Sequence, residues 1–461
     1  MIYSFSGDEC TMNILVINGS PKGQNSITLQ TTNYLKILHP EHEFSVLDAG
    51  QKIKALEKDF SKAVEEVKKA DLLVFSYPVY TFIAPCQLHR FIELLKEANL
   101  DLSSKFATQF TTSKHFYDVT AHRYIKDNCF DLGLKYIKGL SADMDDLSTE
   151  QGQKEVEDFF DYVIFNIQNN IYEKEVKINS LATLTNAEAL ECTDGKPGDV
   201  VIVADCDDND EALKNMIARF RAKCTKNTRI VNIKDYPFKG GCLGCFNCAV
   251  SGKCVYKDNF DEFLRNDIQK AEAIIYAFTI KDHSMGARFK MYDDRQFCNG
   301  HRTVTIGMPI GYLINGHLSV EENLRTIIEA RADVGHNFLC GVATNEEDAN
   351  ESIDKLTKKL DYALEKKILL PQNFYGIGGM KVFRDLIWIM QGMMKADHKF
   401  YKSHNQYDFP QKQWKRMLAM YLVGTLLSSE KMKSKMGDKM NEGMLMPYQK
   451  ALESAKKRMN K

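Results

Sequence analysis

Four cysteines in one short run are the residues whose types and spacing point most directly to chemistry. Cys242, Cys245, Cys248 and Cys254 are spaced C-x2-C-x2-C-x5-C inside the glycine-containing stretch 240–260. The short spacers form turns that aim the sulfurs inward, and glycine adopts turn conformations that other residues resist. Four thiolates suit an iron–sulfur cluster or a tetrahedral structural zinc. Zinc ribbons usually separate two C-x2-C pairs by a longer gap, so the spacing favours an iron–sulfur cluster, with zinc and a metal-free site as alternatives.

The composition is that of a globular protein with more than one domain. The chain has 461 residues, of which 44% are hydrophobic and 27% charged, and its net charge is −1. Two or three domains are expected at this length. With a net charge this close to zero, nothing suggests a positively charged surface that would bind nucleic acid or a membrane. We see no secretory signal, and the apolar run 414–429 is too short to span a bilayer. Twelve cysteines without a signal indicate a reducing compartment, so we expect a cytoplasmic protein.

A second group of chemically suggestive residues lies near the start of the chain. The buried-strand pattern 13–18 is followed by the loop GSPKGQNS and a helical pattern, an arrangement that binds anions at a helix N-terminus. The loop fits neither common nucleotide motif, and an ordinary capped helix is the alternative. The side chains that could donate hydrogen bonds to a phosphate are Ser20, Lys22, Asn25, Ser26 and Thr28.

Strand and helix patterns alternate through the rest of the first half, which predicts a doubly wound parallel sheet. Ligands of such sheets bind beyond the carboxyl ends of the strands. Two further loops should reach that edge. One is the Pro/aromatic loop into which the strand in segment 71–85 runs, and the other is the end of the strand 105–114. Their candidate cofactor residues are Pro78, Val79, Tyr80, Thr81, Phe82, Thr111 and Thr112. With the phosphate loop they suit a phosphorylated aromatic cofactor.

The first half, roughly residues 12–168, resembles the flavodoxin-like NADPH-dependent FMN reductase superfamily. The resemblance rests on Gly19-Ser20-Pro21-Lys22, Asn25-Ser26, Thr28, and Tyr77-Pro78-Val79-Tyr80 followed by Gln87-Leu88 and Phe91. It implies that the first loop binds the phosphate of FMN and that the P-V-Y loop lies against the isoalloxazine. We therefore expect Tyr80 or Phe82 to pack on the flavin ring.

The second half repeats the pattern of strands and helices. Residues 169–197 read as a linker, and residues 198–365 as a second flavodoxin-like domain that contains the cysteine run. That run, with its trailing D-x-F and helix, resembles the iron–sulfur flavoprotein family of the same superfamily, as do Lys290, Asp294 and Arg295. The resemblance implies 4Fe-4S ligation by the four cysteines, close to the flavin of a partner domain.

Two departures from the family pattern predict an asymmetric chain. The loop DCDDNDEAL after the first strand of the second half is acidic, and KDHSMGARF lacks the P-V-Y motif. We therefore expect one FMN per chain, in the first domain. Residues 366–461 read as a helical extension that covers the sheets or makes a dimer contact. Asp397, His398 and Tyr401 are weaker candidates for contact with a redox site, and no catalytic side chain is assigned.

These observations predict two flavodoxin-like α/β domains in tandem with a C-terminal helical extension. The expected function is an oxidoreductase that moves electrons between FMN and a 4Fe-4S cluster, linked to NAD(P)H or ferredoxin. A homodimer is compatible with the sequence. The alternatives are an FMN or quinone reductase with a structural zinc and a non-enzymatic redox sensor with oxidisable thiols.

Overall fold

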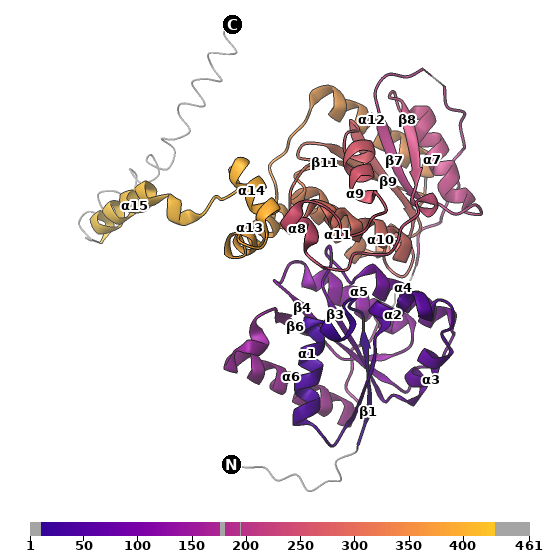
Figure 1. The fold of residues 1–461 in the computed structure, drawn as a ribbon. Helices are drawn as coiled ribbons and strands as arrows, with labels where there is room; N and C mark the ends of the chain where they lie inside the picture. Colours follow the sequence, from indigo (N-terminus) through magenta and orange to yellow (C-terminus); the bar gives the residue numbers. More distant parts are fainter. Residues whose placement is uncertain (1–10, 176–179, 194, 429–461) are drawn as a thin grey trace. The chain divides into compact units, whose positions relative to one another are not determined.

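The fold comes from a computed structural model, which describes residues 11–175, 180–193 and 195–428. One compact unit extends to Phe400, and a second begins at Tyr401. The first unit contains two parallel sheets, which Figure 1 shows in indigo to magenta and in magenta to orange. The predicted fold class is confirmed, because each sheet has the strand order 2-1-3-4-5 of a flavodoxin-like domain.

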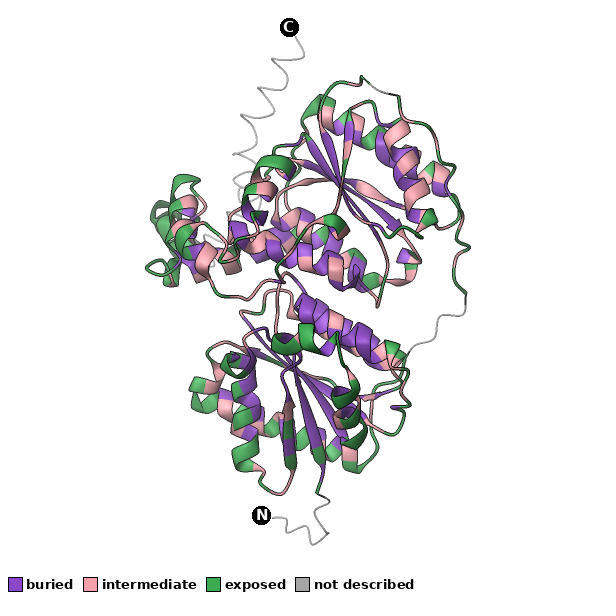
Figure 2. Ribbon diagram, turned by 45° about the vertical axis from the view of Figure 1, so that its right-hand side comes forward, coloured by how far each residue is buried: buried purple, intermediate pink, exposed green. Residues whose placement is uncertain are grey.

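The central strands of the first sheet are buried on both faces. Alternate residues of these strands enter two hydrophobic clusters, one with α1 and α6 and one with α3, α4 and α5. Figure 2 shows the resulting purple strands between helices that are only partly buried. The strands, in the order β2-β1-β3-β4-β5, are β2 (Glu43–Leu47), β1 (Asn13–Asn18), β3 (Leu72–Pro78), β4 (Phe106–Ser113) and β5 (Lys135–Tyr136), and β6 (Leu140–Asp143) also pairs with β4. The helices are α1 (Ile27–Leu38), α2 (Ala49–Leu56), α3 (Ser61–Lys69), α4 (Cys86–Glu97), α5 (Asp118–Asp131) and α6 (Glu150–Gln168).

The second sheet repeats this arrangement. One face packs on α7 and α12, while the other shares its hydrophobic cluster with α10 and α11. The strands, in the order β8-β7-β9-β10-β11, are β8 (Thr228–Asn232), β7 (Val200–Asp205), β9 (Ala273–Thr279), β10 (Pro309–Asn315) and β11 (Phe338–Thr344). The helices are α7 (Glu211–Lys223), α8 (Asn247–Ser251), α9 (Phe260–Phe263), α10 (Gly286–Arg295), α11 (Glu322–Val334) and α12 (Ala349–Lys366).

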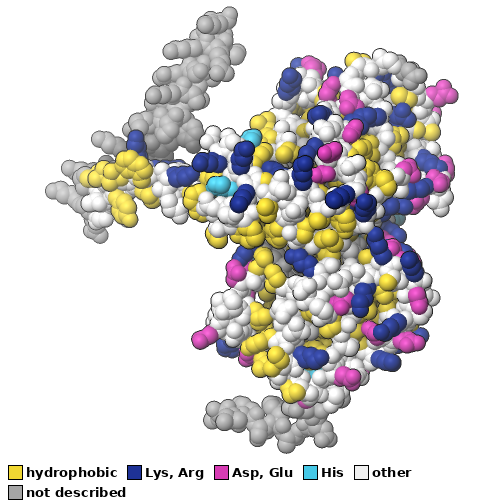
Figure 3. Space-filling model, in the orientation of Figure 1, with side chains coloured by type: hydrophobic (Ala, Val, Ile, Leu, Met, Phe, Trp, Pro, Cys, Tyr) yellow, Lys and Arg dark blue, Asp and Glu magenta, His cyan; other side chains and the backbone are white. Residues whose placement is uncertain are grey.

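The predicted C-terminal extension is helical where the structure describes it. It comprises α13 (Phe374–Ile389), α14 (Lys395–Ser403) and α15 (Trp414–Leu427). In the second unit, α15 exposes large apolar side chains, among them Trp414, Tyr421 and Leu422, which Figure 3 shows as a yellow group. No helix among the described residues is both long and apolar enough to cross a membrane.

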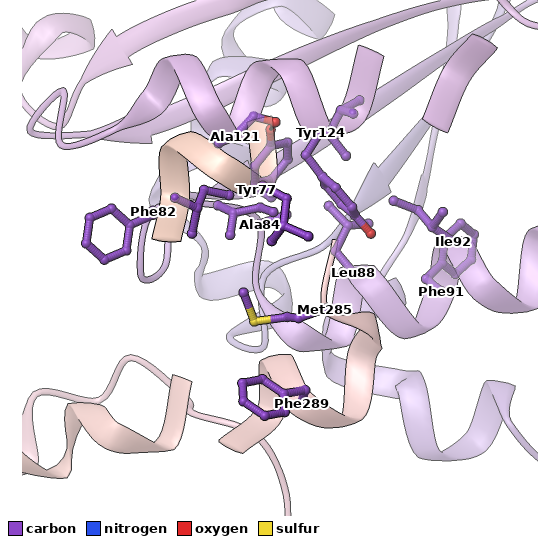
Figure 4. Packing of buried hydrophobic residues seen from close by; sticks show 14 of the residues in the cluster. Tyr77, Phe82, Ala84, Leu88, Phe91, Ile92, Ala121, Tyr124, Met285 and Phe289 are labelled. Carbon is purple, nitrogen blue, oxygen red and sulfur yellow. Dashed lines mark hydrogen bonds between the residues drawn. The ribbon is translucent and has the colours of Figure 1, made fainter. Parts of the chain in front are cut away.

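Helices α4 and α10, which follow the third strand of their respective sheets, join the two domains. Met285 and Phe289 belong to the same buried cluster as Ala84 and Leu88 of the first domain (Figure 4). The side chain of Glu93 on α4 accepts a hydrogen bond from the backbone N–H of Ala287 at 2.8 Å. Side chains of the two sheet domains therefore belong to one hydrophobic cluster.

A buried ammonium–carboxylate pair lies in the same interface. Lys290 and Asp294 on α10 are both 0% exposed, and Lys290 Nζ lies 2.5 Å from Asp294 Oδ1. The ammonium also donates to the carbonyl of Tyr80 at 2.9 Å, while Asp294 accepts from the backbone N–H of Cys86 at 2.8 Å. A charged pair of the second domain thus holds the loop between β3 and α4 of the first.

We predict that His283 makes the stability of this interface depend on pH. Its Nε2 lies 3.1 Å from Asp131 and its Nδ1 lies 3.0 Å from Glu321. Burial opposes the charged form, but the hydrogen bonds and charges of the two carboxylates outweigh it and raise the pKa of His283 to about 10. An unfolded histidine has a pKa of about 6.5, so the stabilisation is full below that pH and is lost as pH rises through about 10.

The measurement is denaturant unfolding of the wild type and His283→Gln from pH 6 to pH 10. The free energy of unfolding of the wild type should fall over this range by more than that of the variant. Other groups titrate equally in both proteins, so equal slopes would contradict the assignment.

Candidate functional site

A cavity of about 220 Å³ lies where the carboxyl-end loops of the first sheet meet the cysteine run of the second domain. All four cysteines of the run line it, together with most of the predicted cofactor residues. Those residues are Ser20, Lys22, Ser26, Thr28, Pro78, Val79, Tyr80, Thr81 and Thr112. The structure thus brings together two groups of residues that are more than 120 positions apart in the sequence.

The loop between β1 and α1 is held in place by the side chain of Asn18. Its amide nitrogen donates to the carbonyl of Gly23 and to Asp48 Oδ1, both at 2.9 Å. The Asn18 amide oxygen accepts from the backbone N–H of Ser20 at 3.2 Å. The loop therefore keeps its shape through groups that face away from the cavity.

Two hydroxyl groups at the junction of this loop and α1 are buried and lack a hydrogen-bond partner among the described residues. Ser26 and Thr28 are 2% and 1% exposed, and within the described part of the chain nothing bonds to Ser26 Oγ or Thr28 Oγ1. Ser26 is the N-cap of α1, yet its side chain caps no backbone N–H, and the first turn carries no acidic residue. Buried polar atoms are normally hydrogen-bonded, and a helix N-terminus attracts anions. An anion in this part of the cavity would satisfy both hydroxyls.

The loop after β3 adopts a backbone conformation that is uncommon for its residues. Thr81 and Phe82 have φ values of 45° and 72°, in the left-handed region. The turn is closed by paired backbone hydrogen bonds between Tyr80 and Ile83, and Thr81 Oγ1 donates to Asp294 Oδ1 at 3.2 Å. Tyr80 therefore faces the cavity because the second domain secures the turn behind it.

Three predicted cofactor residues do not line the cavity. Asn25 is exposed to solvent. Thr111 Oγ1 lies 2.8 Å from His122 Nε2, within the sheet. Phe82 turns away to pack on Phe116 and Tyr117, with ring centroids 5.1 and 4.7 Å apart.

The cysteine run lies against Tyr80. A Cβ added to Gly244, which has a φ of 59°, would lie only 1.9 Å from the Tyr80 hydroxyl, so this position tolerates no side chain. Gln87 of α4 donates to the carbonyl of Cys242 at 3.3 Å. The first domain therefore positions the backbone that carries the first two thiols.

The four thiols differ in exposure. Cys245 is exposed, while Cys242, Cys248 and Cys254 are partly buried. Burial is the main cause that raises the pKa of Cys242, and it raises the pKa of Cys248 to about 11. Among the described residues, no three His, Cys, Asp or Glu side chains stand close enough together to hold a metal ion. The run thus lies along one cavity wall, and ligation of a single centre would draw its sulfurs closer together.

Arg295 supplies a positive charge beside the fourth cysteine. Its Nη2 lies 3.8 Å from Cys254 Sγ, and the guanidinium pairs with Asp258 at 2.7 Å. The side chain is 1% exposed, and its planar group lies over the ring of Tyr256 at 4.5 Å. The guanidinium therefore places a buried positive charge against the sulfur of the fourth cysteine.

Several cavity residues were not found from the sequence. Cys298 lines the cavity near the cysteine run, and burial raises the pKa of its thiol to about 12. The apolar wall comes from separate segments, and includes Phe116, Met144, Phe246, Phe297, Val382, Phe383 and Leu386. No local pattern marks these residues, because they meet only through long-range packing.

In the second domain, a carboxylate lies at the N-terminus of α7, the helix that corresponds to α1 of the first domain. Asp210 is the N-cap of α7 and accepts from the backbone N–H of Leu213 at 3.1 Å. It also accepts hydrogen bonds from Thr279 and from Asn315, which come from the ends of β9 and β10. A side chain of the protein thus takes the place of an anion at this helix, which is the physical reason to expect no flavin phosphate here.

Comparison with known proteins supports the predicted superfamily. A family model described as the flavodoxin-like fold matches residues 12–118. An iron–sulfur flavoprotein from Clostridioides difficile is 24% identical over 135 residues. That match covers 27% of this chain and 60% of the relative, so it spans less than two thirds of the relative's length.

Two solved structures illustrate the range of similar folds. An NADH:FMN oxidoreductase in its apo form has a TM-score of 0.30 and 20% identity, covering 36% of this chain and 92% of its own. An NAD(P)H:quinone oxidoreductase from Methanothermobacter marburgensis has a TM-score of 0.28 and 11% identity, covering 36% and 100%. The resemblance to the flavodoxin-like superfamily is confirmed by the family model and by the relative.

We predict that Ser26→Ala and Thr28→Val weaken anion binding without destabilising the ligand-free protein. Each removes a buried hydroxyl that has no partner within the described ranges of the chain, so the free energy of unfolding should stay constant or rise. A hydrogen bond to a charged group contributes about 1.5–3 kcal/mol, so affinity for inorganic phosphate should fall about tenfold or more per variant. Thermal unfolding with and without phosphate measures both effects.

Thr32→Val is the matched control. Thr32 lies one turn further along α1, and its buried hydroxyl also lacks a partner among the described residues, but it does not line the cavity. An equal loss of phosphate response in this variant would contradict the anion site.

Proposed function

We propose that the chain is an oxidoreductase that holds FMN in its first domain and a 4Fe-4S cluster at its four-cysteine run, and passes electrons between them. One observation carries the proposal. The phosphate-type loop of one domain and all four cysteines of the other line the same cavity. Two redox centres bound there would be close neighbours.

The first domain fits the phosphate and the ring of FMN. Ser26 and Thr28 offer hydroxyls at the N-terminus of α1 to which no described residue bonds, and Lys22 lines the cavity beside them. Tyr80 and the carboxyl end of β4 at Thr112 border the space for a flat ring. When bound, a flavin exchanges electrons in pairs or singly, while the protein supplies binding, orientation and electrostatics.

The cysteine run fits a thiolate-ligated centre by its donor set. Cys242, Cys245, Cys248 and Cys254 border one space, and Arg295 places a cation beside Cys254. The backbone N–H of Gly244 points to Cys242 Sγ at 3.5 Å. Hydrogen bonds and buried cations of this kind favour the anionic sulfurs that iron requires.

The surface beside Cys245 suits an acidic electron-carrier protein such as a ferredoxin. The segment 239–257 contains three lysines, Lys239, Lys253 and Lys257, and no acidic residue. All three lysines are exposed, as are Val250 and Val255. Positive charge around an exposed thiol steers an acidic partner, while NAD(P)H is the candidate donor on the flavin side.

The cysteines also support a reducing compartment, and we place the protein in the cytoplasm. The eleven cysteines among the described residues are all free of disulfide bonds. Secreted proteins of this cysteine content usually pair their thiols.

We predict that replacing any cysteine of the run by serine abolishes or destabilises the cluster and leaves FMN bound. The two centres are assigned to different domains, so loss of a ligand in one should not empty the other. Anaerobic purification followed by iron, sulfide, zinc and flavin analysis measures both. Cys340→Ser is the matched control, because Cys340 is buried in the second sheet away from the cavity.

A wild-type protein with stoichiometric zinc and no iron would instead identify an FMN or quinone reductase with a structural zinc. Flavin without any metal would favour a thiol redox sensor. Two flavins per chain would contradict the asymmetric assignment.

We predict that Tyr80→Ala shifts the absorbance of bound flavin and weakens its binding, whereas Phe82→Ala mainly lowers stability. Tyr80 lines the cavity, while Phe82 is 4% exposed and packs in the core. Removal of a buried phenylalanine ring typically costs about 3–5 kcal/mol of unfolding free energy. Flavin difference spectra and denaturant unfolding separate the two roles, and an unchanged flavin spectrum in Tyr80→Ala would exclude contact with the ring.

A further inference from the structure

The C-terminal extension contributes directly to the walls of the cavity. Val382, Phe383 and Leu386 of α13 line it. The Phe383 ring stacks on Phe116 of the first domain at 4.5 Å and lies edge-on to His301 of the second at 4.8 Å. Residues outside both sheet domains thus complete the cavity by contact with each of them.

Residues 374–400 form an arm that a carboxylate near the start of α14 fastens to the second domain. Asp397 is 0% exposed, although it belongs to an otherwise partly exposed helix. Its Oδ2 lies 3.0 Å from His301 Nδ1, and its Oδ1 accepts from Arg302 Nη1 at 3.0 Å. Gly300 allows this approach, because an added Cβ would lie 2.2 Å from Asp397 Oδ1.

Arg302 extends the contact to the cysteines. The same guanidinium that pairs with Asp397 donates to the carbonyl of Cys248 at 3.4 Å and to the carbonyl of Cys298 at 3.2 Å. The side chain of Arg302 is only 11% exposed, so solvent screens these interactions weakly. A chain of contacts therefore runs from α14 through Arg302 to the backbone of the third cysteine of the run.

We propose that Asp397 is a positioning residue of the four-cysteine site. It orients Arg302, which fixes the Cys248 backbone, and it holds α13 against the cavity as its outer wall. The arm is then a part of the redox site rather than a separate appendage. Its effect on the protein backbone is independent of which metal the cysteines bind, while its effect on a reduction potential rests on the proposed function.

The wall also defines which molecules can reach the first domain. Phe383 and Leu386 border the space over the phosphate loop, which is a partly open cavity of about 220 Å³. A small molecule fits such a space, and a folded protein does not. The structure therefore assigns small molecules to the cavity that the arm borders.

The first test uses the metal-free chain and hydrogen–deuterium exchange. Asp397→Asn and Arg302→Gln should each exchange faster in peptides that cover 246–254 and 298–303. Asp385→Asn is the control, because it removes the same charge from a side chain of the same arm that is 54% exposed. Unchanged protection in Asp397→Asn would overturn the proposal, as would a uniform loss that includes the β3 and β9 peptides, since the assigned role is local.

The second test is potentiometry of the loaded protein. Asp397→Asn removes a negative charge near the cysteines, which favours the reduced centre and should shift its potential in the positive direction. Arg302→Gln removes a positive charge and should shift it in the negative direction. Shifts of the same sign in both variants would overturn the electrostatic part. Absence of iron from the wild type would instead refute the proposed function, and the exchange result would still decide the role of the arm.

Discussion

The buried pair of Lys290 and Asp294 is the interaction on which the arrangement of the site depends. Two charges without solvent contact are costly, and they are tolerated only where geometry and further hydrogen bonds compensate. Here those further bonds go to the loop between β3 and α4, through the Tyr80 carbonyl and the Cys86 N–H. The pair therefore links the position of α10 to the conformation of the turn that begins at Tyr80. The cavity forms because the same pair determines this position and this conformation.

The parts of the site that local sequence describes were predictable. The strand–loop–helix pattern around Ser26 and Thr28 predicts an anion site from local sequence alone, because a helix N-terminus needs no distant residue to attract an anion. The spacing of the cysteines likewise indicates a common centre without knowledge of the fold. The doubly wound parallel sheets followed from the alternation of strand and helix patterns, whereas the ends of single strands are less predictable. Strand β10 begins only at Pro309, although β-branched residues precede it, because residues 304–307 form a turn.

The remaining parts depend on long-range packing and backbone conformation. Phe82 follows Tyr80 by two positions, as alternate residues of a strand would, but left-handed φ values at Thr81 and Phe82 turn its ring into the core. Phe383 and Asp397 contact His301, which lies more than 80 residues earlier in the chain, and no sequence periodicity links these positions. Cys298 lines the cavity although it lies more than 40 residues beyond the cysteine run and belongs to no cysteine motif. Such contacts are set by the tertiary structure and leave no local signature.

The two domains have the same strand order but differ at one helix N-terminus. A carboxylate of the protein, Asp210, caps α7, whereas the hydroxyls of Ser26 and Thr28 at α1 are available to a ligand. This difference bears on how such a chain can change during evolution. In an assembly of identical subunits every substitution occurs in each copy, so a residue that closes one site closes all of them. Joining the copies in one chain removes this symmetry. One half can then lose binding capacity while the other keeps it, and a loop such as 240–260 can be elaborated on one side alone. Covalent linkage also fixes the stoichiometry of the two specialised halves at one to one, whatever the protein concentration.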